Sequence, residues 1–244
     1  TETGQSAQRT IEVRSTFADE DGKIPIKIEM VDLVPAPVPL KARSDENDKP
    51  DKKAAKVANE VQRANDAKGK TKKAQVHLEK ALELAPNSPE ALNALGETYN
   101  RSKDFRKAAD QFQKALDVKP DFYRARVNLG GVLLSLGDYD QALEVNSKAV
   151  EMQPNDAVAQ CQLGQAFFHL KKYDDAMHHL ELAKKLDPMS YTLPGLYIAQ
   201  IYEAKGDNAA ALAEYKEVFK THPNHEYATS IQNEILFLEK QTRK

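Results

Sequence analysis

A skeleton of small, apolar and proline residues returns in this sequence at a fixed interval of thirty-four positions. Glycine, leucine, two alanines and a closing proline keep the same relative places in three successive copies. A period of this length indicates stacked helix pairs, each copy forming one helix, a turn and a second helix. The copies align at Gly96, Gly130 and Gly164; Leu95, Leu129 and Leu163; Ala108, Ala142 and Ala176; Ala115, Ala149 and Ala183; and Pro120, Pro154 and Pro188.

The recurring residue types explain how such pairs pack. Glycine and alanine let two helices approach closely, because a larger side chain at the contact would cost about 1–3 kcal/mol through overpacking. Proline ends the second helix, since it lacks an amide donor and disfavours helical backbone at the residue before it. Asn146 departs from this scheme, because it takes the place of Phe112 and Leu180. We therefore expect a softer layer there, or a hydrogen-bond partner for its amide.

The period predicts an all-α chain of about five units followed by a cap. The first unit is degenerate, with Gln62 where glycine is expected and Asn65 where an aromatic residue is expected. A terminal unit with a polar outer face is what a stack needs for solubility. We assign the units to residues 55–88, 89–122, 123–156, 157–190 and 192–225, and a C-terminal capping helix and tail to residues 226–244.

From about Ala55 to the end, these positions resemble the tetratricopeptide repeat family, and the aromatic residues Tyr99, Phe167 and Tyr202 agree with it. The resemblance implies a right-handed α-solenoid whose first helices line a concave groove. It also implies a non-enzymatic scaffold that binds a protein or peptide without a cofactor, although a fold does not settle what is bound. A β-patterned, proline-ended leader before such repeats is similar to exported bacterial repeat proteins. This likeness slightly favours a periplasmic or extracellular location over the cytoplasm, and the compartment is otherwise open.

One subfamily can be compared residue by residue. Its members grip a C-terminal carboxylate with Lys and Asn on one first helix, Asn on the next, and Lys and Arg on the third. The corresponding positions here hold Asn93 and Glu97, then Asn128, then Val158 and Gln162, and only Asn128 agrees. We therefore expect no carboxylate clamp of that kind.

The family's geometry places a row of first-helix side chains on the groove wall, which turns from polar to apolar along the stack. A contiguous exposed apolar strip usually marks a binding surface, so we expect this strip to contact a peptide. The other interpretation is that the tight inner curvature alone covers it. The candidate groove residues are Asn93, Glu97, Arg101, Arg124, Val127, Asn128, Leu134, Val158, Cys161, Gln165, Phe168, Leu193 and Leu196.

Residues 1–54 differ from the repeats and are interpreted as an N-terminal arm. Alternating apolar residues predict a β-hairpin over residues 11–31. Proline at every second position predicts an extended polyproline segment over residues 34–40. Residues 41–53 are charged and contain no aromatic residue, which indicates a linker.

The arm raises a second hypothesis about function. A lone two-stranded ribbon is marginal in water, so its apolar face needs a surface to dock on. The chain is then a structural, self-assembling homo-oligomer or filament in which the arm docks on a neighbouring subunit. The plainer alternative is a disordered leader. The candidate docking residues are Ile24, Ile26, Ile28, Met30, Val34, Val38 and Leu40.

Composition excludes several classes of partner. Charged residues make up 30% of the chain and leave a formal charge of -2, so a strongly cationic surface for nucleic acid is not favoured. No apolar run is long enough to predict a transmembrane segment. Cys161 is the single cysteine, which excludes an internal disulfide. Because the sequence opens at Thr1 rather than at methionine, we expect that upstream sequence has been removed.

No catalytic or metal-binding constellation emerges from the residue pattern. His169, His178 and His179 lack a cysteine or carboxylate at metal-ligand spacing, so we expect them on exposed helix surface. Cys161 has no basic activator nearby in the sequence and is interpreted as a groove or packing residue. We expect neither enzymatic activity nor a bound cofactor or metal.

Overall fold

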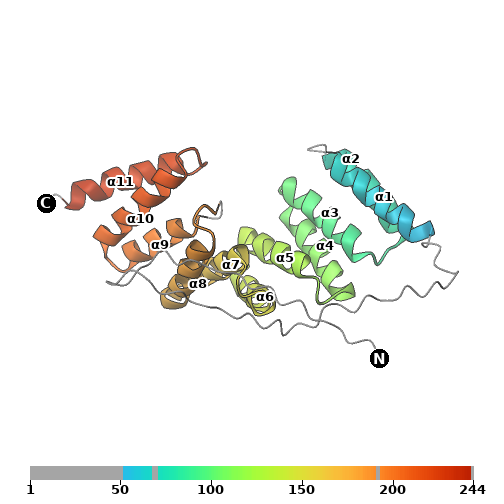
Figure 1. Ribbon diagram of the computed structural model, residues 1–244, viewed down its shortest axis with the longest axis horizontal. Coiled ribbons are helices and arrows are strands. Elements are labelled where there is room, and N and C mark those ends of the chain that lie inside the picture. The colour runs from blue at the N-terminus through green and yellow to red at the C-terminus, as the bar shows by residue number, and fades with distance from the viewer. Residues whose placement is uncertain (1–51, 68–70, 191–192, 243–244) are drawn as a thin grey trace, which may run out of the picture. The chain divides into compact units, whose positions relative to one another are not determined.

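The structure is a computed structural model that describes residues 52–67, 71–190 and 193–242. Every regular element in these ranges is an α-helix, and Figure 1 shows the helices following one another as a row of hairpin pairs. The described residues contain eleven helices: α1 (Lys52–Asp66), α2 (Thr71–Leu84), α3 (Pro89–Arg101), α4 (Phe105–Val118), α5 (Tyr123–Leu136), α6 (Tyr139–Met152), α7 (Ala157–His169), α8 (Tyr173–Leu186), α9 (Pro194–Ala204), α10 (Asn208–Thr221) and α11 (Ala228–Thr242).

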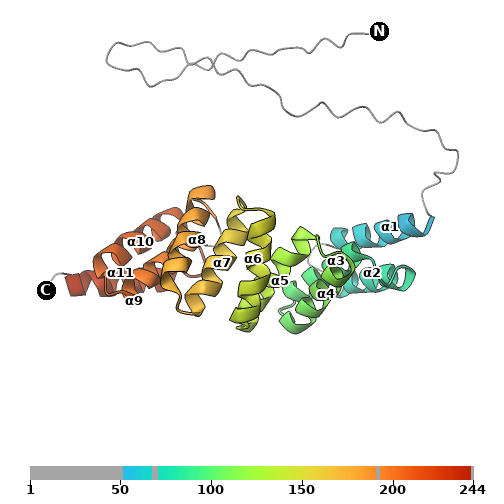
Figure 2. The same ribbon diagram turned by 90° about the horizontal axis from the view of Figure 1, so that it is seen from below.

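Consecutive helices pack against each other along the whole row, from α1 with α2 to α10 with α11 (Figures 1 and 2). Their buried apolar side chains form several clusters along the array instead of one central core. This is the packing of a repeat array, in which each unit contacts its neighbours. The predicted all-α solenoid is confirmed.

The N-terminal predictions fall largely outside the described residues. The hairpin over 11–31, the polyproline segment over 34–40 and the docking role of the arm therefore stay predictions. The linker predicted over 41–53 was drawn too long, because Lys52 and Lys53 already belong to α1. Lysine and alanine are good helix formers, and Val57 in the next turn is buried against the following helices. The bounds assigned to the units also stay predictions.

Short polar side chains begin several of these helices. Ser88 Oγ accepts a hydrogen bond from the Ala91 amide at 3.3 Å, and Asp156 Oδ1 accepts one from the Ala159 amide at 2.9 Å. Each bond satisfies an amide that has no partner within the first helical turn. At the end of α5, Gly137 adopts a left-handed conformation with φ of 81°, which glycine accepts without steric cost. Lys171 takes the same conformation after α7 with φ of 59°.

The recurring alanines and glycines lie where paired helices meet. Ala108, Ala142 and Ala176 are fully buried. A methyl group added at Gly96 would stand 2.6 Å from the Phe112 ring, too close for any carbon contact. The small residues therefore set the distance between the two helices of a pair, as the sequence predicted.

Asn146 is the exception in this interface. It is fully buried in α6 against Gly130 of α5, in the place where Phe112 and Leu180 pack in the neighbouring pairs. Neither its Nδ2 nor its Oδ1 atom has a hydrogen-bond partner among the described residues. A buried polar group without a partner costs about 1–3 kcal/mol. The sequence allowed a soft layer or a partnered amide, and the described part of the structure shows an amide without a partner, which favours the soft layer.

We predict that Asn146→Leu stabilises the protein by about 1–3 kcal/mol, because it removes two unpartnered polar atoms from the core. Leu180 already packs against Gly164 in the equivalent place, so a leucine fits opposite a glycine. The measurement is urea unfolding followed by circular dichroism. The reciprocal change Leu180→Asn should lower the free energy of unfolding by a similar amount. Equal stability of Asn146→Leu and wild type would contradict this account of the layer.

Two glycines distinguish crowding from helix propensity. A methyl group at Gly164 would lie 2.6 Å from Leu180 Cγ and 3.2 Å from a backbone nitrogen, whereas at Gly131 it meets the Gln162 amide nitrogen at 2.8 Å. Gln162 can rotate its amide away, but the backbone of α8 cannot. We expect Gly164→Ala to destabilise the protein by about 1–3 kcal/mol. Gly131→Ala should be closer to neutral, since alanine favours a helix by about 1 kcal/mol over glycine. Thermal unfolding of both variants tests the difference, and equal losses would count against it.

Candidate functional site

The contacts between helices of successive pairs define an inner face. The first helices of the pairs contact one another, α1 with α3, α3 with α5, α5 with α7 and α7 with α9. Among the described residues, the backbones of the second helices α2, α4, α6, α8 and α10 do not approach one another as closely. A row of pairs that is closer on one side curves toward that side. The first helices therefore line the concave face, which we call the groove.

The floor of the groove between α3 and α5 is a polar cluster of Asn93, Glu97, Arg124 and Asn128. Asn93 Nδ2 donates to Glu97 Oε1 at 2.8 Å, and Asn128 Nδ2 donates to the same oxygen at 3.2 Å. Asn128 Nδ2 also donates to Asn93 Oδ1 at 3.1 Å. Arg124 completes the cluster with an ion pair of 2.8 Å from Nη2 to Glu97 Oε1. The side chains of two successive first helices are thus held together around one carboxylate.

This cluster bears on the carboxylate clamp that the sequence argued against. Asn128 is the one residue that agrees with the clamp, and its amide nitrogen is engaged by Asn93 and Glu97. A negative side chain occupies the centre of the cluster, where a clamp needs donors. A partner carboxylate placed there would be repelled by Glu97.

Farther along, the contact between first helices changes from charged to uncharged. The amide nitrogen of Gln162 in α7 lies against Gly131 of α5, 2.8 Å from the position that a methyl group at Gly131 would take. One turn on, Gln165 Nε2 donates to Cys161 Sγ at 3.4 Å. The middle of the groove is therefore lined by amides and small residues.

At the α7–α9 contact an aromatic cluster replaces these polar groups. It consists of Tyr139 at the start of α6, Phe168 and His169 at the end of α7, and Tyr197 of α9. The rings of Tyr139 and His169 are stacked with centroids 4.2 Å apart, and Tyr197 meets Phe168 edge to face at 5.4 Å. Burial raises the pKa of Tyr197 to about 12, so its hydroxyl stays protonated at neutral pH. Such edge-to-face pairs stabilise a fixed arrangement of rings.

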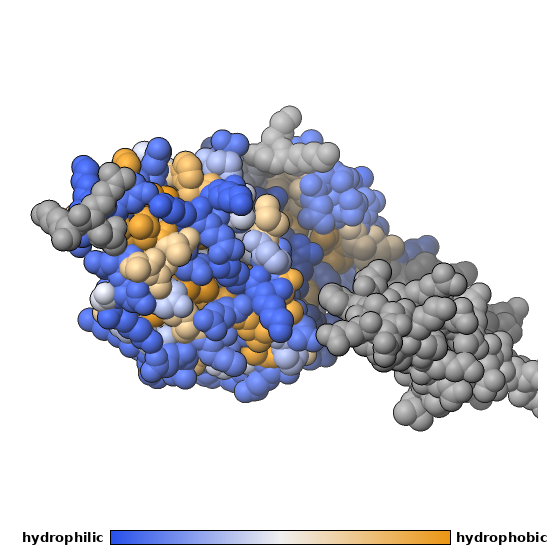
Figure 3. Space-filling model, turned by 60° about the vertical axis from the view of Figure 1, so that its left-hand side comes forward, coloured by the Kyte–Doolittle hydropathy of each residue, from blue (hydrophilic) through white to orange (hydrophobic). Residues whose placement is uncertain are grey.

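The structure divides the candidate groove residues by exposure, and the open apolar strip is narrower than the sequence suggested. Cys161 and Leu193 are buried because they pack with the second helices, so they offer little surface. Figure 3 shows hydrophobic residues on the viewed face as patches separated by hydrophilic ones. The buried candidates are Asn93, Cys161 and Leu193; the partly buried ones are Glu97, Val127, Asn128, Leu134, Gln165, Phe168 and Leu196; the exposed ones are Arg101, Arg124 and Val158.

Three residues of the floor were not among the candidates, namely Tyr139, Gln162 and Tyr197. Asn128, Gln162 and Tyr197 occupy corresponding places in three successive units and each reaches back to the preceding first helix. The period therefore contained a signal for Gln162 and Tyr197. Tyr139 belongs to a second helix and approaches His169 through the packing of neighbouring units, which the period alone does not show.

His169 and His178 lie on exposed helix surface as expected, whereas His179 does not. His179 is partly buried, its Nδ1 lies 2.7 Å from Gln160 Oε1, and its ring stacks on Phe167 at 5.5 Å. Gln160 donates its amide nitrogen to the Pro154 carbonyl, which leaves its oxygen to accept from His179. His179 therefore ties α8 to α7. The described residues contain no group of three His, Cys, Asp or Glu side chains that could hold a metal ion.

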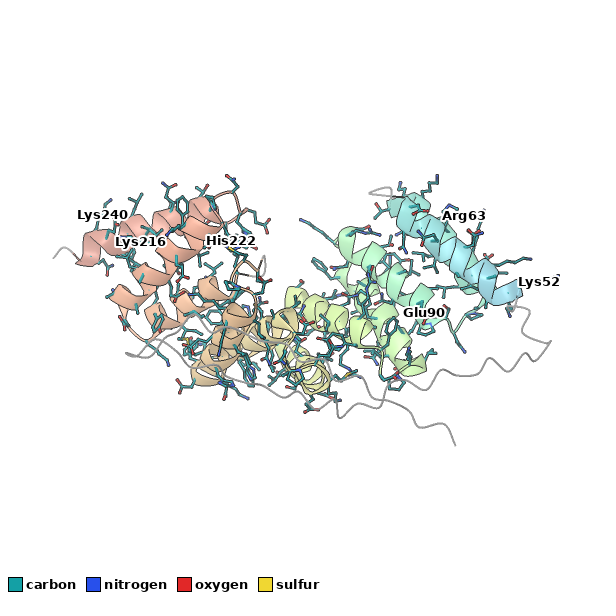
Figure 4. The ribbon with its side chains drawn as sticks, viewed as in Figure 1. Lys52, Arg63, Glu90, Lys216, His222 and Lys240 are labelled. Atoms are coloured by element: carbon teal, nitrogen blue, oxygen red, sulfur yellow. The ribbon has the colours of Figure 1, made fainter. Side chains whose placement is uncertain are left out.

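Ion pairs near the C-terminal end connect second helices to their neighbours. Lys184 of α8 donates to Glu214 at 2.9 Å and to Glu217 at 2.8 Å, both on α10. Burial lowers the pKa of Lys184, but the two carboxylates outweigh it and raise the pKa. Lys216, labelled on α10 in Figure 4, pairs with Glu239 of α11 at 2.7 Å. These charges act in packing and lie on helices that do not line the groove.

Comparisons with known proteins agree with this architecture. Four family models described as tetratricopeptide repeats match residues 61–121, 101–157, 133–192 and 195–225. The chain belongs to the tetratricopeptide repeat family. Proteins of this family are generally non-catalytic scaffolds that bind protein partners. No described helix is both long enough and apolar enough to span a membrane.

Solved structures of this family share the fold. MamA from Desulfovibrio magneticus RS-1 is 25% identical, with 71% of this chain and 97% of that chain covered and a TM-score of 0.63. YrrB, described as a TPR protein with an unusual peptide-binding site, is 24% identical over 75% and 94%, with a TM-score of 0.61. PilF of Pseudomonas aeruginosa is 20% identical over 78% and 91%, with a TM-score of 0.61. No curated protein sequence matches the chain significantly.

We predict that the protein loses stability as the pH falls from about 7 to about 5, partly through His169. Partial desolvation by the neighbouring rings of Tyr139, Phe168 and Tyr197 lowers the pKa of His169 below its ordinary value of 6.5, although the residue stays exposed. The folded protein therefore favours the neutral ring. Above pH 6.5 its contribution is complete, and it is lost as the pH falls toward the folded pKa, because the unfolded chain takes up the proton first.

His169→Phe tests this prediction, since it keeps an aromatic ring beside Tyr139 and removes the titration. The melting temperature of the variant should fall less between the two pH values than that of wild type. Thermal unfolding followed by circular dichroism measures both. The same pH dependence in the variant would show that His169 is not a source of the loss.

Proposed function

We propose that this protein is a non-enzymatic interaction scaffold that holds an extended segment of a partner protein in its groove. The observation that carries the proposal is that the inner face keeps polar and aromatic side chains partly exposed on successive first helices. Their positions repeat along the array, so they match the repeating backbone of an extended chain. The proposed contact residues are the candidates of the groove other than the buried Cys161 and Leu193, with Gln162, Tyr197 and Tyr139 added.

The groups on the floor suit recognition of a backbone. Asn128 uses its amide nitrogen within the polar cluster, and no hydrogen bond of the described residues engages its Oδ1 atom. Gln165 likewise donates its Nε2 to Cys161 Sγ, and no hydrogen bond of the described residues engages its Oε1 atom. Amide oxygens of this kind can accept main-chain N–H groups of a bound peptide, while side-chain pockets provide specificity. The solved structure of YrrB supports the shared fold, and its peptide-binding site is a property of that protein.

Two valines permit a matched test of the groove. Val158 lies at the start of the first helix α7 and is 37% exposed, whereas Val118 lies at the end of the second helix α4 and is 43% exposed. We expect Val158→Glu to weaken binding of peptides selected on the wild-type protein by about tenfold or more, because a carboxylate there loses water when the peptide binds. Val118→Glu should leave binding unchanged.

The peptides are selected from a display library of random linear peptides, and affinities are measured by fluorescence anisotropy. Circular dichroism confirms that both variants are folded. If no peptide is enriched, or if both valine variants bind selected peptides as the wild type does, the groove is not the binding site.

A further inference from the structure

We propose that the two halves of the groove bind chemically different parts of one segment, one half binding apolar residues and the other binding polar residues. The half formed by α7 and α9 takes an uncharged run of aromatic, aliphatic or proline residues. The half formed by α3 and the start of α5 takes polar residues. This inference rests on the proposed function and specifies the chemistry of the partner segment.

The distribution of charge is the first observation. Helix α7 contains no Asp, Glu, Lys or Arg in Ala157–His169, although the chain as a whole is 30% charged. In α5 the charged residues stop after Arg126, and the stretch from Val127 to Leu136 has none. In α9 the single charged residue is Glu203, which accepts a hydrogen bond from Tyr215 of α10. A long stretch of the first helices thus offers no counter-ion to a charged ligand group.

That absence decides which segment fits. A charged side chain laid on the α7–α9 floor would lose water and meet no side chain of opposite charge that is free to pair with it. Burying even a neutral polar group without a partner costs about 1–3 kcal/mol in proteins, and a charge costs more. Apolar and proline side chains carry no such penalty. The α7–α9 floor therefore disfavours ligand segments that carry charged side chains.

The aromatic cluster supplies the matching attraction. Phe168 and Tyr197 meet edge to face with their planes at 74°, and His169 stands edge to face with Phe168 at 76°. Rings held at right angles present both edges and faces along one surface. Aromatic-lined grooves of this kind bind proline-rich and apolar segments. The four rings come from α6, α7 and α9, so the surface is built by successive units.

The other half of the groove has a different character. Helix α3 carries Glu90, Glu97 and Arg101, and Arg124 at the start of α5 pairs with Glu97. Arg101 Nη2 also donates to Thr98 Oγ1 at 3.2 Å. With Arg126, two acidic and three basic side chains nearly balance one another here. This half suits polar residues without requiring a net charge, so affinity should depend weakly on salt.

The experiment compares synthetic variants of a peptide selected on the wild-type protein. A single Asp or Lys is placed at each position in turn, and affinity is measured by fluorescence anisotropy at low and high salt. We expect a continuous run of positions where either charge lowers affinity about ten- to a hundredfold, and a second run where both are tolerated. Similar tolerance at every position, or a penalty for one sign of charge alone, would overturn the inference.

Two protein variants test whether the α7–α9 half of the groove is the part that excludes charge. Tyr197→Gln places in α9 the glutamine that α7 has at the corresponding position, Gln162. It should reduce the loss of affinity caused by a charge at the sensitive peptide positions. The control Phe237→Gln changes an exposed ring on α11, a helix that makes no contact with α9, and should keep the full penalty. An unchanged penalty in a folded Tyr197→Gln variant would overturn the placement at the α7–α9 half.

The outcomes separate this inference from the proposed function. Some peptides could bind the wild-type protein, bind Val158→Glu more weakly and still tolerate a charge at every position. Such peptides would support the groove as the binding site and refute the exclusion of charge from its α7–α9 half. Peptides indifferent to Val158→Glu refute the groove itself. The peptide scan uses wild-type protein alone, so it stays decisive even if Tyr197→Gln fails to fold.

Discussion

Close contact between the two helices of each pair is the constraint on which the rest of this structure depends. Glycine in the first helix and alanine in the second permit it, and the ring of Phe112 or the branch of Leu180 fills the space directly above the glycine. The three middle pairs repeat this contact, and successive helices pack in a continuous row. The regular row then brings the first helices together and creates the inner face.

The sequence predicted this architecture because each helix pair needs small residues at its contact, so glycine and alanine recur at the period of the repeat. Gly96 and Ala108 could be assigned to a helix contact from the period alone, and the structure buries both. The beginning of α1 was missed by a few residues, since Lys52 and Lys53 look like linker until the packing of Val57 is known. The period also located the soft layer at Asn146, although not which of its two forms the structure would have.

The groove was harder to predict than the fold. The row of inward positions followed from the family's geometry, but burial depends on contacts between units that no single unit encodes. The sequence left Cys161 as a groove or a packing residue, and the structure buries it against the following helices. Tyr139 was not singled out from the sequence, and it stacks on His169 of the next unit. Features made by neighbouring units together are the ones that a residue-by-residue interpretation misses.

The unpartnered amide of Asn146 has a mechanical consequence for the protein as a recognition surface. The α5–α6 pair that contains it lies in the chain between α3, which bears half of the polar cluster, and α7, which bears half of the aromatic cluster. A layer that gains little from staying closed is where thermal fluctuations begin. We expect bending at that layer to alter the spacing of the two clusters while leaving each intact, which would let one molecule adapt to bound segments of unequal length.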